Sequence, residues 1–149
     1  MNTSTHSIGD VTSCDHSQSW VYTDVVKDHF FHPRNFVQDE EEVNTFEGHG
    51  QYGSPACGDE MHVWIKVDPD SKRITDFKWR TFGCASAIAA TSIASEIVLE
   101  NGGMTIEEAK HLKPQTIIER LGGLPNRKIH CSVLCDKALL KAIEDYENR

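Results

Sequence analysis

The sequence lacks any apolar run approaching the roughly 20 residues of a membrane-spanning helix, and acidic residues outnumber basic ones. Its 15 Lys and Arg residues against 23 Asp and Glu residues give a formal net charge of −8. Nucleic-acid binding requires clustered Lys and Arg, and a compact basic patch such as Arg127-Lys128 is too small to supply that cluster. We therefore expect neither a membrane protein nor a nucleic-acid-binding protein.

The first 19 residues contain no Lys or Arg and no apolar core, so they match neither a secretory signal nor an Arg-rich mitochondrial presequence. This Ser-, Thr-, His- and Asp-rich stretch predicts a disordered tail over residues 1–19, with Cys14 in it. The five cysteines are odd in number and are not spaced like a secreted disulfide framework. We expect a cytoplasmic protein whose thiols are free or bound to metal.

Residues 20–149 predict one domain, because no linker or internal repeat divides them and their length suffices for a single core. Apolar residues at helical spacing predict a helix from Val21 to Phe31, which Pro33 ends, and the acidic stretch 39–42 reads as a solvated loop. Two segments of alternating polarity, 61–68 and 74–82, predict an antiparallel hairpin, preceded by an irregular or edge strand between Gly48 and Gly53. Further helices are predicted at 85–99, after the capping-box pattern Thr105-x-x-Glu108, from Pro114 to the Gly122-Gly123 stop, and at 131–146.

Three short stretches carry residues suited to binding a metal. Cys57 and Asp59 flank Gly58, which permits a tight turn, and side chains two residues apart in an extended strand point the same way. Cys84 lies where a strand passes into a helix, and the pair His130-Cys131 opens the last helix. A helix N-terminus lowers the pKa of a thiol, which favours the thiolate that binds metal.

Each of these residues also has a plainer explanation when taken alone. An isolated Asp59 would more often cap or solvate a loop, and an isolated Cys84 could be a small buried apolar residue. Cys135 belongs to an apolar stripe that runs along the last helix, so we expect it in the core. The remaining histidines, for which surface or hairpin positions suffice, are His29, His32, His49, His62 and His111.

Taken together, thiolates with an imidazole suit zinc, iron or an iron–sulfur cluster. A carboxylate among them is a harder and weaker ligand than a thiolate. A site that holds its metal permanently would more often be all Cys, or Cys with His. The presence of Asp59 therefore indicates a site that releases what it binds.

Four segments are typical of one family: residues 28–35 (DHFFHPRN), 55–59 (PACGD), 81–89 (TFGCASAIA) and 123–132 (GLPNRKIHCS). With these segments, the chain resembles the iron–sulfur cluster scaffold proteins of the IscU and NifU N-terminal family from Trp20 to Tyr146. The approach to His130-Cys131 is more similar to the NifU-type branch, while the SufU-type branch lacks the His and carries a longer insertion after the second cysteine. Since nothing follows Arg149, we expect the scaffold domain alone.

The resemblance implies an α+β fold in which a small antiparallel sheet of about three strands packs against several helices. It implies that a [2Fe–2S] cluster is assembled on Cys57, Asp59, Cys84 and Cys131, with His130 as a further candidate ligand. Cys131 would accept persulfide sulfur from a cysteine desulfurase. Iron would come from an iron-delivery or frataxin-like protein and electrons from a ferredoxin or other donor, and the cluster would pass to acceptor apo-proteins.

Such a protein is a carrier and not an enzyme, and the sequence leaves open whether it forms a homodimer. Many family members carry Leu-Pro-Pro-Val-Lys before the His-Cys pair, where a dedicated Hsp70-type chaperone binds. Residues 124–128 read Leu-Pro-Asn-Arg-Lys, which loses the second Pro and the Val. Release of the cluster by an Hsp70-type chaperone is therefore doubtful. The role expected for Lys128 is instead at the cluster site, near the thiolate that accepts sulfur.

Two other functions fit the same residues. Zinc occupies tetrahedral sites of Cys, Asp and His readily, so a zinc-bound thiol protein could relay persulfide sulfur without building clusters. A hydrolytic zinc enzyme would need a general base and a substrate pocket, and no Glu or His is placed in sequence to suggest them. Reconstitution with iron, cysteine and a desulfurase separates the scaffold from the relay protein.

Overall fold

The structure is a computed structural model that describes residues 23–54, 59–82, 85–123 and 130–148 of the 149-residue chain. The side chains of Ser54, Asp59 and residues 130–134 lie outside the description as well. The predicted tail over residues 1–19 also falls outside the described ranges. Within those ranges, no helix combines the length and the apolar character needed to cross a membrane.

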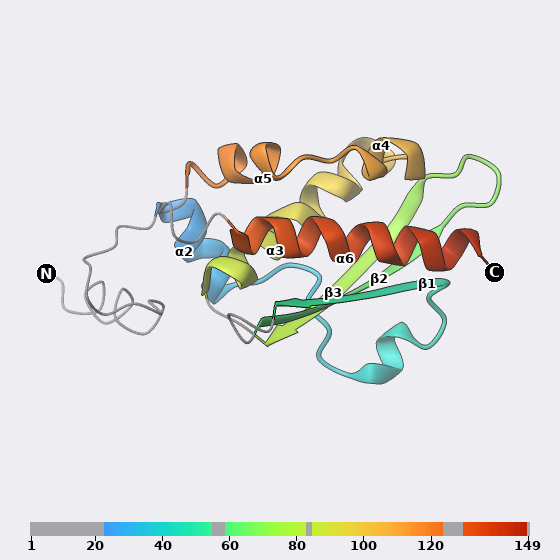
Figure 1. Ribbon diagram of the computed structural model, residues 1–149, viewed down its shortest axis with the longest axis horizontal. Helices are drawn as coiled ribbons and strands as arrows, with labels where there is room; N and C mark the ends of the chain where they lie inside the picture. Colours follow the sequence, from blue (N-terminus) through green and yellow to red (C-terminus); the bar gives the residue numbers. More distant parts are fainter. Residues whose placement is uncertain (1–22, 55–58, 83–84, 124–129, 149) are drawn as a thin grey trace, which may run out of the picture.

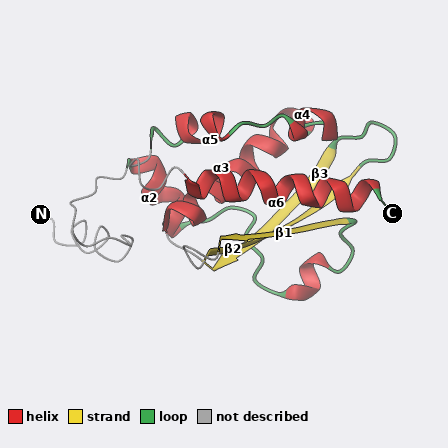
Figure 2. Ribbon diagram, viewed as in Figure 1, coloured by secondary structure: helices red, strands yellow, loops and turns green. Residues whose placement is uncertain are grey.

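Three antiparallel strands form the sheet, in the order β1 (Gly48–Ser54), β2 (Asp59–Val67) and β3 (Ile74–Phe82) (Figures 1 and 2). At one end of the sheet Ser54 pairs with Asp59 and Glu60 pairs with Phe82. Beyond the outer edge of β3, Phe36 forms an isolated parallel bridge with Trp79. The predicted hairpin and edge strand are confirmed, and the bounds of β3 agree with those expected from its alternation.

The helices follow the order α2 (Asp24–Phe31), α3 (Ala85–Leu99), α4 (Ile106–Lys110), α5 (Pro114–Arg120) and α6 (His130–Glu147), with short 3-10 turns η1 (Glu40–Val43) and η2 (Glu100–Gly102). Helices α3 and α6 lie on one face of the sheet, α6 against β1 and α3 against β3, with α4 and α5 farther out (Figure 1). On the opposite face, the segment that contains η1 packs Val37, Val43 and Phe46 against Trp64. The fold is thus α+β, as expected.

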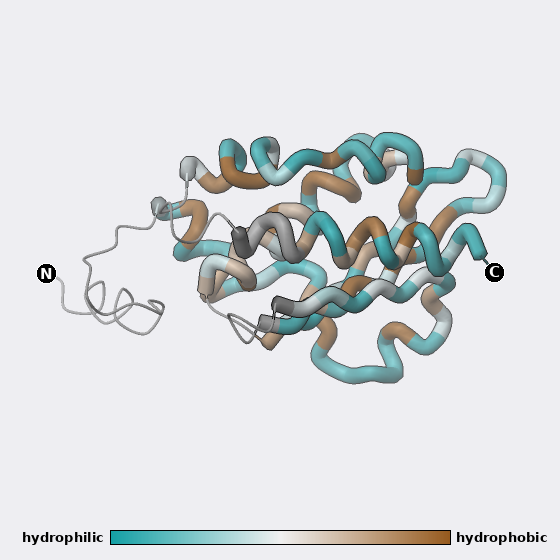
Figure 3. Tube along the Cα trace, in the orientation of Figure 1, coloured by the Kyte–Doolittle hydropathy of each residue, from teal (hydrophilic) through white to brown (hydrophobic). Residues whose placement is uncertain are grey.

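The core lies between the sheet and helices α3 and α6, and its residues are apolar. Figure 3 colours the hydrophobic residues of these elements brown along the trace of the chain. Three alternate residues of β2, Met61, Val63 and Ile65, are fully buried in this core. Gly48 and Gly50 let the α6 backbone approach β1 closely. A Cβ on Gly48 would lie 2.5 Å from the carbonyl oxygen of Ala142, so no larger residue fits without a shift.

Helix α3 is buried on nearly all sides, which explains its many small residues. Twelve of its residues are buried, including Ser86, Thr91, Ser92 and Ser95. The hydroxyls of Thr91 and Ser95 donate to the carbonyl oxygens of Ala87 (2.7 Å) and Ser92 (2.6 Å), as buried hydroxyls must find partners. The small side chains of α3 therefore serve close packing.

Two expectations about the first part of the chain need correction. The described helix starts at Asp24, with Thr23 as its N-cap, and its buried residues are Val26 and His29. Val25 and Phe31, expected on the apolar face, are 38% and 45% exposed. Helix α2 packs on α3, and the contact of His29 with the Ser92 hydroxyl favours this orientation.

The acidic stretch is exposed as predicted but is not an irregular loop. Glu40–Val43 forms a 3-10 turn, because the Asp39 carboxylate caps it and Val43 is anchored in a small apolar cluster. Its carboxylates face basic side chains of β3, with Glu40 3.5 Å from Arg80 and Glu42 3.9 Å from Lys78. These ion pairs are exposed, so they add little stability.

Candidate functional site

One end of the sheet brings together two of the three segments that carry predicted ligands. Because Ser54 pairs with Asp59, the connection that contains Cys57 leaves and re-enters the sheet at this end. Glu60, the next residue of β2, pairs with Phe82, the last residue of β3. The chain reaches position 84 two residues after Phe82, and α3 starts at Ala85.

The third segment arrives at the same end through the packing of α6 on β1. Gly48 lies against Ala142 and Gly50 against Ala138, so the helix and the strand run in opposite directions. From Gly50 to Ser54 the strand advances by about 13 Å, which corresponds to about nine residues of helix. Counted back from Ala138, this places the first turn of α6 beside the paired ends of β1 and β2. Figure 1 shows α3 and α6 starting at this same end of the molecule.

The predicted ligands are placed by their elements alone. Asp59 is the first residue of β2, and His130 and Cys131 are the first two residues of α6. Positions 57 and 84, together with Cys14 and Lys128, lie outside the described residues. Which side chains bind metal therefore stays a prediction. Within the described part of the chain, no group of three or more His, Cys, Asp and Glu residues is arranged to hold a metal ion.

Two long helices point their N-termini toward this end of the sheet. Helix α3 has 15 residues and α6 has 18, and the first four backbone N–H groups of an α-helix have no acceptor within the helix itself. The partial positive charge at a helix N-terminus favours the thiolate over the thiol.

Cys135 has the opposite environment, and its prediction as a core residue is confirmed. Its side chain is fully buried, and burial raises the pKa of its thiol to about 12, although a hydrogen bond with Thr91 opposes the shift. A thiol with this pKa stays protonated near neutral pH. Cys135 therefore cannot supply a thiolate without a large cost in free energy.

One exposed apolar side chain, Phe82, lies at the described rim of this end. Phe82 is 60% exposed, and the guanidinium of Arg80 lies over its ring, 6.0 Å from the centroid. Next to it the Thr81 hydroxyl donates to the carbonyl oxygen of Glu60 (2.6 Å), which ties the ends of β2 and β3 together. The rim combines a firm backbone with an accessible apolar side chain.

Asp136 is a titratable residue near the start of α6 that the sequence analysis did not single out. It is half-buried, and desolvation raises the pKa of its carboxyl to about 6, while Lys137 acts in the opposite direction. The signal for it was its position next to Cys135 in the apolar stripe of the last helix. Its carboxyl is partly protonated just below neutral pH.

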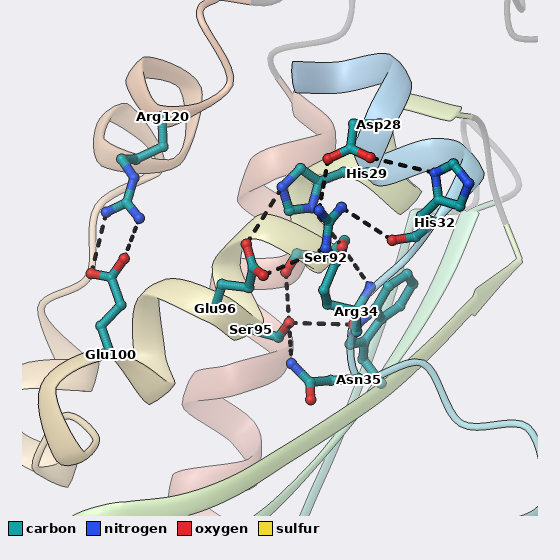
Figure 4. A network of polar contacts seen from close by, with 11 residues as sticks. Asp28, His29, His32, Arg34, Asn35, Ser92, Ser95, Glu96, Glu100 and Arg120 are labelled. Atoms are coloured by element: carbon teal, nitrogen blue, oxygen red, sulfur yellow. Dashed lines mark hydrogen bonds and ion pairs between the residues drawn. The ribbon is translucent and has the colours of Figure 1, made fainter. Parts of the chain in front are cut away.

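A polar network joins α2 to α3, and it contradicts the surface position expected for His29 (Figure 4). His29 is 4% exposed, and its Nδ1 lies 2.7 Å from the Ser92 hydroxyl. Burial, followed by the charge of Arg34, lowers the pKa of the imidazole, while Glu96 and Asp28 oppose that shift. His29 is three residues from Val26, so the helical period could have placed it on the buried face. The other four histidines, at exposed or hairpin positions as expected, are His32, His49, His62 and His111.

Comparison with protein families matches residues 21–149 to the model described as NifU-like N terminal domain. The chain is 47% identical over 126 residues to "Iron-sulfur cluster assembly scaffold protein IscU 1" of Archaeoglobus fulgidus, which covers 85% of this chain and 76% of that protein. It is 43% identical over 129 residues to the IscU scaffold protein of Azotobacter vinelandii, covering 86% of this chain and 95% of that protein. The nitrogen fixation protein NifU of Trichormus azollae is 41% identical over 129 residues, and the match spans 42% of its length.

Solved structures share the fold. A NifU-like protein (N-terminal) from Brucella abortus superposes with a TM-score of 0.64 at 16% identity, over 85% of this chain and 94% of that one. A putative scaffold protein for the SUF system from Fervidobacterium islandicum gives a TM-score of 0.59 at 20% identity, over 82% and 96%. The family match over residues 21–149, with relatives at 47% identity, leads to one conclusion: the chain belongs to the NifU-like N-terminal domain family.

Proposed function

We propose that this protein is a scaffold on which an iron–sulfur cluster is assembled and from which the cluster passes to other proteins. The observation that carries the proposal is 47% identity, over 85% of the chain, to a relative named as an iron–sulfur cluster assembly scaffold. The convergence of β1, β2, α3 and α6 at one end of the sheet supports it, because the candidate ligands belong to those elements or their connections. In this role iron and sulfide are the cargo of the site.

We propose a [2Fe–2S] cluster held by Cys57, Cys84 and Cys131, with Asp59 as the ligand that makes it labile. Thiolate is the usual protein ligand of such clusters, and a carboxylate binds their iron less firmly. His130 would be an accessory ligand, because its neighbour already supplies a thiolate and adjacent residues at a helix start seldom both reach one atom. Zinc could occupy the same ligands in purified protein.

Cys131 would act as the persulfide acceptor, for which a thiolate at the start of α6 is well suited. A cysteine desulfurase would supply the persulfide, whose outer sulfur becomes sulfide when it takes two electrons from a ferredoxin or another donor. An iron-delivery or frataxin-like protein would supply iron, and acceptor apo-proteins would receive the cluster. The protein itself would be a carrier in the cytoplasm and not an enzyme. Its scaffold domain would span residues 20–149, and residues 1–19 would form a disordered tail outside that domain.

The test is reconstitution with ferrous iron, cysteine, a reductant and a cysteine desulfurase under argon. A scaffold develops visible iron–sulfur absorbance and passes the cluster to an apo-ferredoxin, whereas a zinc-bound sulfur relay accepts persulfide without developing that absorbance. Single Cys→Ser variants of the five cysteines distinguish the proposed ligands from Cys14 and Cys135, which we expect to be dispensable for cluster assembly. Loss of the cluster in a folded Cys135→Ser variant would contradict this division.

A further inference from the structure

The segment 34–37 bridges α3 and β3, and we refer to it as the brace. On the side of α3, the backbone N–H of Arg34 donates to the Ser92 hydroxyl at 2.9 Å. The side-chain amide of Asn35 donates to the Ser95 hydroxyl, also at 2.9 Å (Figure 4). Both serines are fully buried, so these hydrogen bonds are shielded from water.

On the side of β3, the brace is bonded to a single residue, the fully buried Trp79. The indole N–H donates to the carbonyl oxygen of Arg34 at 2.7 Å. The backbone N–H of Trp79 donates to the Asn35 carbonyl at 3.2 Å, and its carbonyl accepts from the N–H of Val37 at 2.9 Å. The brace therefore continues the sheet by one short parallel bridge and contacts α3 at the same time.

The conformation of Asn35 makes both sets of bonds available. Its φ of 63° is in the left-handed region, which Asn tolerates better than most residues, and this turn directs its amide to α3 and its carbonyl to β3. The guanidinium of Arg34 adds contacts with Asp28 (2.7 Å) on α2 and Glu96 (3.5 Å) on α3. These last pairs are at least partly exposed, so the buried bonds of the brace contribute more to its rigidity.

Strand β3 and helix α3 are consecutive in the chain and are joined through positions 83 and 84. Trp79 lies about 13 Å along the strand from this junction, and Ser92 and Ser95 lie about 12 and 17 Å along the helix from it. The brace thus connects the strand and the helix at comparable distances from their common end. It limits changes in the angle and the separation between them.

We propose that Asn35 and Ser95 are positioning residues for the metal ligand at position 84. The inference rests on the proposed function, since Cys84 is a ligand only within it. A ligand set tolerates displacements of only about 0.5 Å before its geometry deteriorates. Loosening the brace lets α3 move relative to β3, and the thiolate at their junction then meets the other ligands less often in the binding geometry.

The test removes each partner of the Asn35–Ser95 hydrogen bond in turn. It measures metal affinity separately from cluster assembly. Asn35→Gly keeps the left-handed φ accessible and deletes the amide, while Ser95→Ala deletes its partner. Cobalt(II) affinity of the reduced apo-protein is measured from the thiolate-to-cobalt charge-transfer absorbance, and unfolding by urea is followed in parallel. We expect each variant to bind cobalt(II) on the order of tenfold more weakly, in the range found when a supporting residue behind a metal ligand is changed.

The double variant distinguishes a shared contact from two separate effects. If the Asn35–Ser95 bond is responsible, the double variant binds cobalt(II) no more weakly than the weaker single variant. Should either single variant fail to fold, the other measures the same contact. The control is Thr105→Ala, which removes the capping box of α4 and lowers stability at a position outside the brace and the predicted ligand segments.

Three results would overturn the proposal: parental affinity in both single variants, an equal loss of affinity in Thr105→Ala, or full additivity in the double variant. The proposed scaffold function is tested by a different result. A parent protein that binds cobalt(II) through thiolates but builds no cluster with a desulfurase would reject the scaffold function and leave the positioning result standing.

Discussion

The close approach of α6 to β1 makes the substitution Gly48→Ala a sensitive test of the fold. A Cβ at this position would lie 2.5 Å from the carbonyl oxygen of Ala142 and 2.9 Å from a side-chain carbon of Ile65. Ordinary contacts begin near 3.4 Å, so the helix must move away by roughly 1 Å, and a close-packed interior does not absorb that shift elsewhere. Because the nearest atom belongs to the backbone, we expect a cost near the upper end of overpacking, about 3 kcal/mol.

Urea unfolding followed by circular dichroism measures this cost, and a loss of about 3 kcal/mol corresponds to a Tm lower by roughly 6–12 °C. The matched control is Gly102→Ala, whose Cβ would meet nothing within 4 Å but whose φ of 84° disfavours Ala. We expect the control to lose only about 1 kcal/mol. A Gly48→Ala variant no less stable than Gly102→Ala would refute the close packing of α6 on β1, and with it the placement of His130 beside the end of the sheet.

Four further predictions concern individual side chains. His29 has a lowered pKa in the folded protein, so its contribution to stability is complete above its unfolded pKa of about 6.5 and is lost as the pH falls through the folded value. Urea unfolding between pH 7.5 and 5 should therefore show a decline in stability that is smaller in His29→Gln. Cys135→Ala should lose about 1 kcal/mol for the contacts of one buried sulfur and still assemble a cluster, and a folded variant without visible absorbance would contradict its core role. Asp59→Ala should assemble a cluster that survives longer in air and transfers more slowly to apo-ferredoxin, whereas faster decay would show that the carboxylate retains the cluster. His130→Ala should still bind a cluster or zinc, and complete loss of both would make the imidazole an obligatory ligand.

Local patterns predicted most elements, because each is determined by residues close together in the chain. Alternating polarity defined β3, and the capping box at Thr105 marks the start of α4 in the structure as it does in the sequence. The apolar stripe of the last helix placed Cys135 correctly in the core. These features depend on period and end signals, which the sequence displays directly.

The same local reasoning misplaced His29, because the environment of a side chain depends on what another element offers it. The sequence shows His29 as a polar residue beside an apolar period, and only the structure shows the Ser92 hydroxyl that makes its burial favourable. The brace was equally hidden. Residues 28–35 were identified as a family segment, yet their contacts with Ser95 and Trp79 span about 40 to 60 positions of the chain.

The sequence by itself determined the elements, the family and the residue types suited to an iron–sulfur cargo. Only the tertiary structure decided that β1, β2, α3 and α6 meet at one end, since this requires the register of Ser54 with Asp59 and the antiparallel packing of α6 on two glycines of β1. Pairing and packing bring together residues that no local pattern relates. They do so because burial of apolar surface acts between whole elements, while period and capping act within one.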